Sequence, residues 1–194
     1  MDSSHLRLFV ACELPEVLRS ALAGLQADLR ERAGVQLRWV RAEGIHLTLK
    51  FLGEVNESRL DQIESALRGS VEPFDVGVGP AKLGGFGGGR LKVIWVGLEG
   101  DLDELGQLAR VVERALAPVG FEEESRPFRP HLTLARVPDR LGNDQRGELS
   151  ELVSAFEVPA MPDVRLSQLS LIRSVLGPGG ARYETISTYP AGPS

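Results

Sequence analysis

The pattern of apolar and polar positions repeats one arrangement twice along the chain. Mostly apolar runs at residues 6–12 and 91–98, each with a basic residue near its start, predict two buried strands. After each run, apolar residues recur every three or four positions, at 17–32 and 102–116. This spacing is typical of an amphipathic helix with one buried face. The first half and the second half of the sequence therefore each predict a strand followed by a long helix.

Shorter patterns fill the rest of the chain. Helical spacing at 60–67 and 145–153 predicts two further helices. Strands are predicted at 37–40, 74–78, 156–158, 164–175 and 182–189. The glycine run at 84–89 predicts a turn between strands, and Pro178-Gly179-Gly180 predicts a hairpin turn. With 194 residues, these elements are enough to bury a sizeable core in one domain or two closely packed lobes.

Two polar tetrads of the same type interrupt these patterns, 85 positions apart. They are His46-Leu47-Thr48-Leu49 and His131-Leu132-Thr133-Leu134, and they contain two of the three histidines. Each tetrad continues into a run with the composition of a strand, at 48–52 and 132–137, which predicts extended structure there. Because side chains alternate along a strand, each histidine would lie beside a threonine, with the leucines turned to the core. We expect two His/Thr pairs, each on one face of a sheet.

The spacing indicates an internal duplication. Arg7 and Lys92 open the two apolar runs, and each tetrad begins 39 residues after that basic residue. A constant offset through strand, helix and tetrad is typical of two copies of one unit. Two such units would place their tetrads across a cleft with pseudo-twofold symmetry.

Composition and charge narrow the class of ligand. Hydrophobic residues make up 42% and charged residues 25% of the chain, and the formal net charge is −5. A net negative charge argues against a protein that coats nucleic acid through a general basic field. Basic residues nevertheless gather near the tetrads: Arg38, Arg41 and Lys50 around the first, and Arg126, Arg129, Arg136 and Arg140 around the second. This distribution favours a small anionic group.

The sequence also predicts the compartment. The only cysteine, Cys12, lies in an apolar run, so no internal disulfide is possible and a reducing environment is suitable. No apolar run approaches the length of a membrane helix, and the first residues lack the features of a signal peptide. We expect a cytoplasmic protein without membrane contact.

Two histidines suit acid–base chemistry at a phosphate. Their ordinary pKa near 6.5 allows one imidazole to be neutral while the other is protonated, so one takes a proton and the other donates one. The hydroxyls of Thr48 and Thr133 can donate to phosphate oxygens, and arginine can offset the charge. This reasoning leaves open which histidine is the acid.

Strand parity separates the basic candidates. Lys50 and Arg129 share parity with the neighbouring histidines, whereas Arg136 has the opposite parity and reaches the site only if the strand ends or twists. Phe9, Trp39 and Phe51 are candidates for contact with a base, with packing in the core as the alternative for each.

Other chemistries are less well supported. A zinc site needs three or four ligands, and only two suitable histidines occur, with no further ligand at a typical spacing. A nucleophilic role for Cys12 would require an accessible thiolate. The glycine run lacks the Gly-Lys-Ser/Thr ending of a phosphate-binding loop. A module that binds RNA ends without turnover is the main alternative to an enzyme, although it would not need two histidines.

The tetrads resemble the paired His-x-Thr-x motifs of the two-histidine phosphoesterases. In the residues around the tetrads, the chain is similar to the RNA 2′,3′-cyclic phosphodiesterases, also called 2′-5′ RNA ligases. The segments that carry this resemblance are Arg7–Ala11, His46–Glu54, Gly85–Gly87, Phe128–Arg136 and Leu169–Ser174. These segments are spread over nearly the whole chain, and no motif position departs from the family pattern.

The resemblance implies an α+β fold, with residues 1–194 forming one domain of two pseudo-symmetric lobes. Two antiparallel sheets would line a central cleft, with helices outside. It implies hydrolysis of a terminal RNA 2′,3′-cyclic phosphate, or of a cyclic nucleotide, to a 2′-phosphate, with 2′-5′ ligation as the reverse reaction. His46 would be the acid for the 3′-oxygen and His131 the base for water. Neither a metal nor another cofactor is expected, and the protein is expected to be a monomer.

Overall fold

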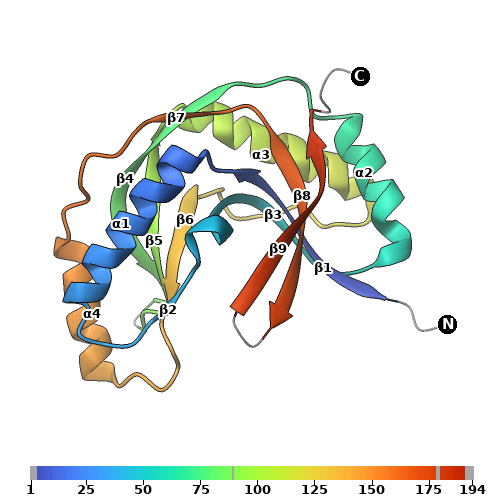
Figure 1. The fold of residues 1–194 in the computed structure, drawn as a ribbon. Coiled ribbons are helices and arrows are strands. Elements are labelled where there is room, and N and C mark those ends of the chain that lie inside the picture. Colours follow the sequence, from blue (N-terminus) through green and yellow to red (C-terminus); the bar gives the residue numbers. More distant parts are fainter. Residues whose placement is uncertain (1–3, 89, 178–179, 191–194) are drawn as a thin grey trace.

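The computed structural model describes residues 4–88, 90–177 and 180–190. Figure 1 shows a strongly curled sheet with helices on its outer side. The strands are β1 (His5–Glu13), β2 (Arg38–Trp39), β3 (His46–Asn56), β4 (Val76–Phe86), β5 (Val93–Gly100), β6 (His131–Arg136), β7 (Val164–Leu166), β8 (Leu169–Gly177) and β9 (Gly180–Tyr189). The helices are α1 (Glu16–Arg32), α2 (Leu60–Arg68), α3 (Leu102–Leu116) and α4 (Asn143–Ala155), with 3-10 turns at Ala42–Gly44, Glu57–Arg59 and Ala117–Val119.

All strand pairs are antiparallel, in the order β7-β4-β5-β6-β3-β1-β8-β9, with β2 also paired to β6. We call β3, β1, β8 and β9 the first half of the sheet, and β7, β4, β5, β6 and β2 the second half. The halves are related by the approximate symmetry that the sequence predicts, because β3 corresponds to β6 and β1 to β5. The expected α+β fold of two lobes is confirmed, and the two expected sheets are joined at β3 and β6.

The two long helices cross over between the halves. Helix α1 follows β1 of the first half but packs on the second half (Figure 1). There the side chain of Gln26 donates to the carbonyl of Leu134 on β6 at 2.9 Å. Helix α3 follows β5 of the second half but packs on the first, where Glu113 pairs with Lys50 on β3. This exchange links the two halves, because each half is covered by a long helix that follows a strand of the other half.

One large apolar core fills the space between the sheet and the helices. Its members include the buried faces of α1 and α3, which carry Leu18, Leu22, Leu25 and Leu29, and Leu105, Leu108, Val112 and Leu116. A second, small cluster lies apart from it and consists of Phe9, Ala11 and Ile172, with Tyr183 packed against them. The sheet is therefore apolar on its outer face and only locally apolar on its inner face.

Most predicted elements are present, with shifted bounds. The predicted strand at 156–158 is wrong, since residues 156–163 form no regular element. Pro159 and Pro162 interrupt this segment, and proline cannot donate to a strand ladder. The strand predicted at 164–175 is divided into β7 and β8. Pro178 and Gly179, in the predicted hairpin turn, lie outside the described residues, although β8 and β9 do pair on either side of them.

The glycine run is only partly a turn. Gly84 and Gly85 belong to β4, and Gly87 and Gly88 adopt positive φ angles of 131° and 60° after the strand ends. A Cβ atom at Gly84 would lie 2.4 Å from the ring of Trp95 on the paired strand β5. Gly84 is thus required because an indole ring lies across its backbone, which is a packing role.

Among the described residues, no helix combines the length and the apolar character needed to cross a membrane.

Candidate active site

The two tetrads meet where the halves of the sheet join. Strands β3 and β6 pair through Leu47 and Leu132, the second residue of each tetrad. Both leucines are fully buried on the outer face, so the histidines and threonines lie on the inner face. The antiparallel register brings the histidine of each tetrad toward the threonine of the other. The result is a group of four polar side chains around a pseudo-twofold axis.

Both histidines are oriented in the same way. Nδ1 of His46 lies 2.9 Å from the carbonyl oxygen of Gly44, and Nδ1 of His131 lies 2.8 Å from that of Arg129. A carbonyl only accepts, so Nδ1 carries a proton in both rings. The other nitrogen, Nε2, is then the atom that gains or loses a proton. This shared hydrogen bond prepares both rings for acid–base chemistry at Nε2.

The hydroxyls of Thr48 and Thr133 are half-buried beside these rings. Within the described part of the chain, neither hydroxyl has a hydrogen-bond partner from the protein. A threonine hydroxyl on a sheet can form a hydrogen bond to a nearby protein group, but these two form none to the described residues. Two unused donors beside two histidines are suited to bind an anion.

Aromatic rings hold each histidine from the side. The ring of His46 meets Tyr183 and Phe9 edge-on, with centroid distances of 4.9 and 5.7 Å. The ring of His131 meets Phe86 edge-on at 4.8 Å and Trp95 at 6.1 Å. Edge-to-face packing restricts the rotation of each imidazole. The sequence does not predict that Tyr183, Phe86 and Trp95 contact the histidines, because these contacts depend on the pairing of strands.

A β-bulge follows each tetrad at the same place. In the first half, Thr48 pairs with Ala11 and Lys50 with Val10, so Leu49 is an extra residue. In the second half, the register shifts in the same way after Thr133, and Leu134 is the extra residue. A bulge reverses the alternation of side chains beyond it. This shift decides which basic residues reach the inner face.

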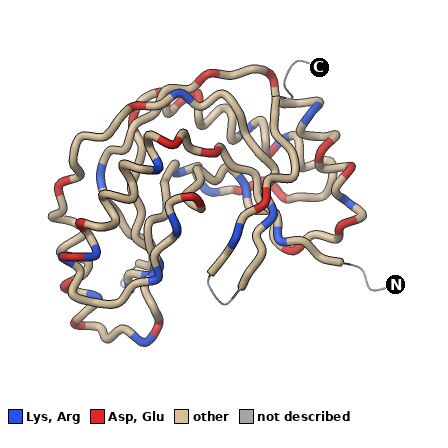
Figure 2. The backbone as a smooth tube through the Cα atoms, viewed as in Figure 1, with Lys and Arg blue, Asp and Glu red and all other residues tan. Residues whose placement is uncertain are grey.

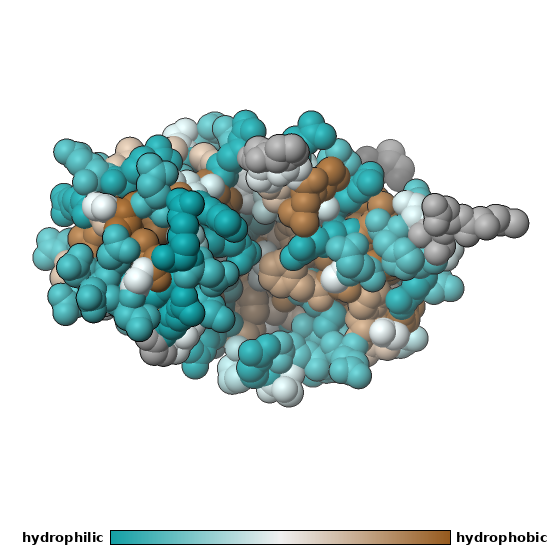
Figure 3. Space-filling model, turned by 90° about the horizontal axis from the view of Figure 1, so that it is seen from below, coloured by the Kyte–Doolittle hydropathy of each residue, from teal (hydrophilic) through white to brown (hydrophobic). Residues whose placement is uncertain are grey.

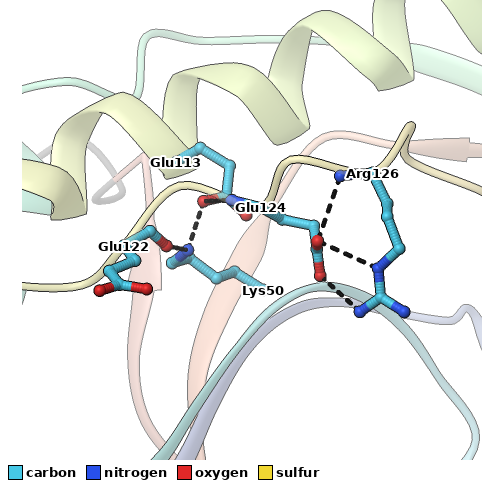
Figure 4. Close-up of polar contacts among 5 residues, drawn as sticks. All are labelled: Lys50, Glu113, Glu122, Glu124 and Arg126. Carbon is cyan, nitrogen blue, oxygen red and sulfur yellow. Dashed lines mark hydrogen bonds and ion pairs between the residues drawn. The ribbon is translucent and has the colours of Figure 1, made fainter.

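The prediction that Lys50 shares the face of His46 is wrong. After the bulge, Leu49 and Lys50 are both buried on the outer face. The Lys50 ammonium pairs with the carboxylate of Glu113 on α3 and donates to the carbonyl of Glu122 at 2.7 Å (Figure 4). Its side chain is 7% exposed. Lys50 therefore anchors α3 behind the tetrad, and it does not face the histidines.

The same geometry brings Arg136 to the inner face. Its parity in the sequence is unfavourable, but the bulge at Leu134 turns its exposed side chain to the side of His131. The condition stated for Arg136, a change in the strand, is thus met. Arg129 precedes β6, and its side chain is exposed while its carbonyl binds the ring of His131. A substrate contact by the Arg129 side chain stays a prediction.

The position that corresponds to Arg136 in the first half is Phe51. This side chain is 66% exposed on the inner face, and its ring lies 5.8 Å from that of Phe9. Phe9 itself is buried, and Trp39 packs against the main core. Figure 3 shows the recess between the two lobes, with hydrophilic surface mainly on the second-half side and apolar surface on the first-half side. The site is symmetric in its tetrads and asymmetric in its flanks.

A carboxylate adds a second asymmetry. Glu13 on β1 is the direct cross-strand partner of His46, whereas Gly97 occupies the matching position opposite His131. Oε1 of Glu13 accepts hydrogen bonds of 2.9 Å from the hydroxyls of Ser170 and Thr185. The sequence offers no signal for this role, because Glu13 reads as an ordinary polar residue at a strand end.

Burial lowers the pKa of His46 below its usual value of 6.5, because the charged ring loses contact with water. The Gly44 carbonyl and the Glu13 carboxylate act in the opposite direction, and the Arg19 charge adds to the lowering. His46 is therefore a stronger acid than a free imidazole, with Glu13 limiting the shift.

Two other candidate chemistries can be compared with the structure. Cys12 is fully buried, which raises the pKa of its thiol to about 12, so Cys12 lacks the accessible thiolate that a nucleophilic role requires. Among the described residues, no group of three His, Cys, Asp or Glu side chains is arranged to hold a metal ion.

Comparisons with known proteins agree with this geometry. The family model described as "LigT like Phosphoesterase" matches the chain twice, at residues 13–95 and 96–183. The chain belongs to the LigT-like phosphoesterase family. Its two matches divide the protein into the two repeats that the tetrad spacing predicts.

Individual relatives cover almost the whole chain. An RNA 2′,3′-cyclic phosphodiesterase of Methanothermobacter thermautotrophicus is 34% identical in an alignment of 188 residues that covers 95% of this chain and 98% of that protein. The crystal structure of E. coli LigT in apo form aligns with a TM-score of 0.71 and 27% identity, over 96% of this chain and 98% of LigT. LigT complexed with 3′-AMP aligns with a TM-score of 0.70 and 25% identity, over the same shares. This LigT-like protein thus shares its fold, over nearly its whole length, with E. coli LigT.

Proposed function

We propose that this LigT-like protein hydrolyses terminal RNA 2′,3′-cyclic phosphates to 2′-phosphates. The observation that carries the proposal is the pair of tetrads around the Leu47–Leu132 junction, with both Nε2 atoms prepared for proton transfer. The names of the relatives support the same substrate class. Reverse 2′-5′ ligation would use the same groups in the opposite order.

In the proposed reaction, Nε2 of neutral His131 accepts a proton from water while the water oxygen forms a new bond to phosphorus. The bond between phosphorus and the 3′-oxygen breaks, and Nε2 of protonated His46 gives its proton to that oxygen. The 2′-phosphate remains on the product. After turnover His131 is protonated and His46 neutral, and exchange of protons with water restores the starting state.

The remaining side chains act on charge and position. Thr48 and Thr133 donate hydrogen bonds to the non-bridging oxygens, which carry most of the developing charge. Arg136 adds positive charge from the second half, and Arg129 is a further candidate there. Phe51 offers an exposed ring on which the terminal base can stack.

The assignment of His46 as the acid is supported by Glu13. A carboxylate beside an imidazole favours its protonated form, and His131 has only Gly97 at that position. The acid must begin the reaction protonated, and Glu13 opposes the lowering of the His46 pKa by burial, so Glu13 helps to keep His46 in that form.

An oligonucleotide with a 2′,3′-cyclic phosphate end tests the proposal directly. We expect conversion to a product with a 2′-phosphate, detected by chromatography and by its resistance to a 3′-specific phosphatase. Tight binding without turnover would instead favour the alternative of a module that binds RNA ends.

We expect hydrolysis to continue in EDTA at an unchanged rate, because the proposed acid, base and charge-stabilising groups are all side chains of the protein. The measurement compares initial rates on a cyclic phosphate substrate before and after dialysis against the chelator. Loss of activity that a divalent ion restores would overturn the two-histidine mechanism.

The pH dependence should separate the roles of the histidines. Burial lowers the pKa of His46, so the alkaline fall of kcat/KM should begin below the ordinary histidine value. In the complex, the phosphate charge favours the imidazolium, so the fall of kcat should lie at higher pH. Both limbs belong to the coupled pair of histidines.

Glu13→Gln sharpens this test. Removing the carboxylate lowers the pKa of His46 further, and the alkaline limb of kcat/KM should then move to lower pH. If His46 is instead the base, the acidic limb moves to lower pH and the alkaline limb stays in place. The variant therefore distinguishes the two assignments by which limb moves.

We further propose that the protein acts as a monomer in the cytoplasm. The recess lies within one chain, and the buried, reduced Cys12 is compatible with that compartment.

A further inference from the structure

A pair of arginines lies on the inner face beyond the tetrads. Strand β2 pairs with the end of β6, and in this register Arg38 stands directly opposite Arg136. Directly opposed residues of antiparallel strands point to the same face, with Cα atoms about 4.5–5.5 Å apart. Both side chains are exposed. The neighbouring pair, Trp39 and Ala135, turns to the core, which agrees with this assignment of faces.

The same row of the sheet connects these arginines to the catalytic group. Arg136 also pairs with Val93 on β5, and Val93 pairs with Phe86 on β4. The ring of Phe86 contacts His131. Arg38, Arg136 and Phe86 therefore lie on one continuous face, with Arg38 one strand beyond Arg136.

No carboxylate of the described residues pairs with either of these charges, Arg38 or Arg136. Like charges placed directly opposite each other destabilise a sheet. Figure 2 shows Lys and Arg positions on strands of both halves of the sheet, in a chain whose net charge is −5. A ligand with more than one negative charge would offset this cost.

We propose that Arg38, next to Arg136, binds the phosphodiester that precedes the terminal nucleotide. The inference rests on the proposed function and narrows its substrate class to RNA 3′ ends, as distinct from cyclic mononucleotides. A cyclic phosphate has a single negative charge, which the protonated histidine, two threonines and Arg136 are enough to bind. A second guanidinium one strand farther along the face matches the next charge of an RNA chain, and arginine binds phosphate oxygens in a bidentate manner.

The test compares a cyclic mononucleotide with a dinucleotide that ends in the same 2′,3′-cyclic phosphate. For the wild-type protein, we expect a higher kcat/KM on the dinucleotide. Arg38→Gln should lower kcat/KM about tenfold more on the dinucleotide than on the mononucleotide. The loss should appear in KM, because Arg38 contacts a phosphate that does not react. Arg110→Gln, on the exposed surface of α3, removes the same charge away from the recess and is the matched control.

A dinucleotide with a neutral methylphosphonate between its two nucleosides isolates the contact. The kcat/KM of the wild-type protein should be no higher on this substrate than on the mononucleotide. Arg38→Gln should then lower kcat/KM by no more on this substrate than on the mononucleotide. Arg38→Lys should recover part of the preference, since it restores the charge without the bidentate geometry. The thermal midpoint of Arg38→Gln in low salt should equal or exceed the wild-type value, because like-charge repulsion is relieved.

Equal losses on both substrates would place Arg38 at the terminal phosphate and overturn the inference, as would no loss on either. A loss on the dinucleotide that persists with the methylphosphonate would also overturn it. These outcomes leave the proposed function intact. Failure of the wild-type protein to hydrolyse either substrate would instead overturn the proposed function.

Discussion

Replacement of either tetrad histidine by alanine should lower turnover of a 2′,3′-cyclic phosphate by about 10² to 10⁴-fold. Each Nε2 carries one of the two proton transfers, and the third histidine, His5, lies at the end of β1 opposite to Glu13, the partner of His46. His46→Ala and His131→Ala should therefore both be severe, although the phosphate-binding groups remain. Single-turnover rates at high enzyme concentration measure the residual activity.

The third histidine provides the control. His5 pairs with Asn56 at the end of β3 that is farthest from His46, so His5→Ala should retain turnover near the wild-type value. Far-ultraviolet circular dichroism should be the same for all three variants, since both tetrad histidines lie on the partly open inner face. A tetrad variant that is folded and retains near-normal turnover would remove that histidine from the mechanism.

Replacement of Lys50 by methionine should lower the free energy of unfolding by about 3 to 5 kcal/mol. The change leaves the carboxylate of Glu113 largely buried, with a side chain 14% exposed, and without its cation. Urea denaturation monitored by circular dichroism measures the loss. The cause is the uncompensated charge, so the double variant Lys50→Met/Glu113→Gln should recover most of the stability.

Lys82→Met, at an exposed position of β4, is the matched control and should change stability by less than about 0.5 kcal/mol. A small loss for Lys50→Met, combined with a large rise in KM for the substrate, would contradict the assignment of Lys50 to the outer face. The pair of measurements thus separates an anchor for α3 from a substrate contact.

Several features follow from the sequence alone because they depend on local patterns. The tetrads, their 85-residue spacing and the repeated order of strand and helix predict two related units, and the family model matches the chain in two repeats. Side chains alternate along any strand, so each histidine was expected beside its threonine. Cys12 lies in an unbroken apolar run, and its burial follows from that run.

Sequence reasoning fails where strand parity is interrupted. The rule of alternation assumes a regular ladder, and it places Lys50 with His46 and turns Arg136 away. One extra residue after each tetrad, Leu49 or Leu134, reverses both assignments. The bulge is a property of two paired strands, so neither strand alone reveals it.

The partners across strands depend on tertiary structure for the same reason. Glu13 becomes the neighbour of His46, and Arg38 the neighbour of Arg136, through a hydrogen-bond register between segments far apart in the chain. The pair Leu47–Leu132 joins β3 to β6 and sets the tetrads side by side. The sequence by itself determines which groups can react and that they occur twice. Only the register of the folded sheet decides which charges surround each of them, because that register is fixed by pairing between distant strands and by no local pattern.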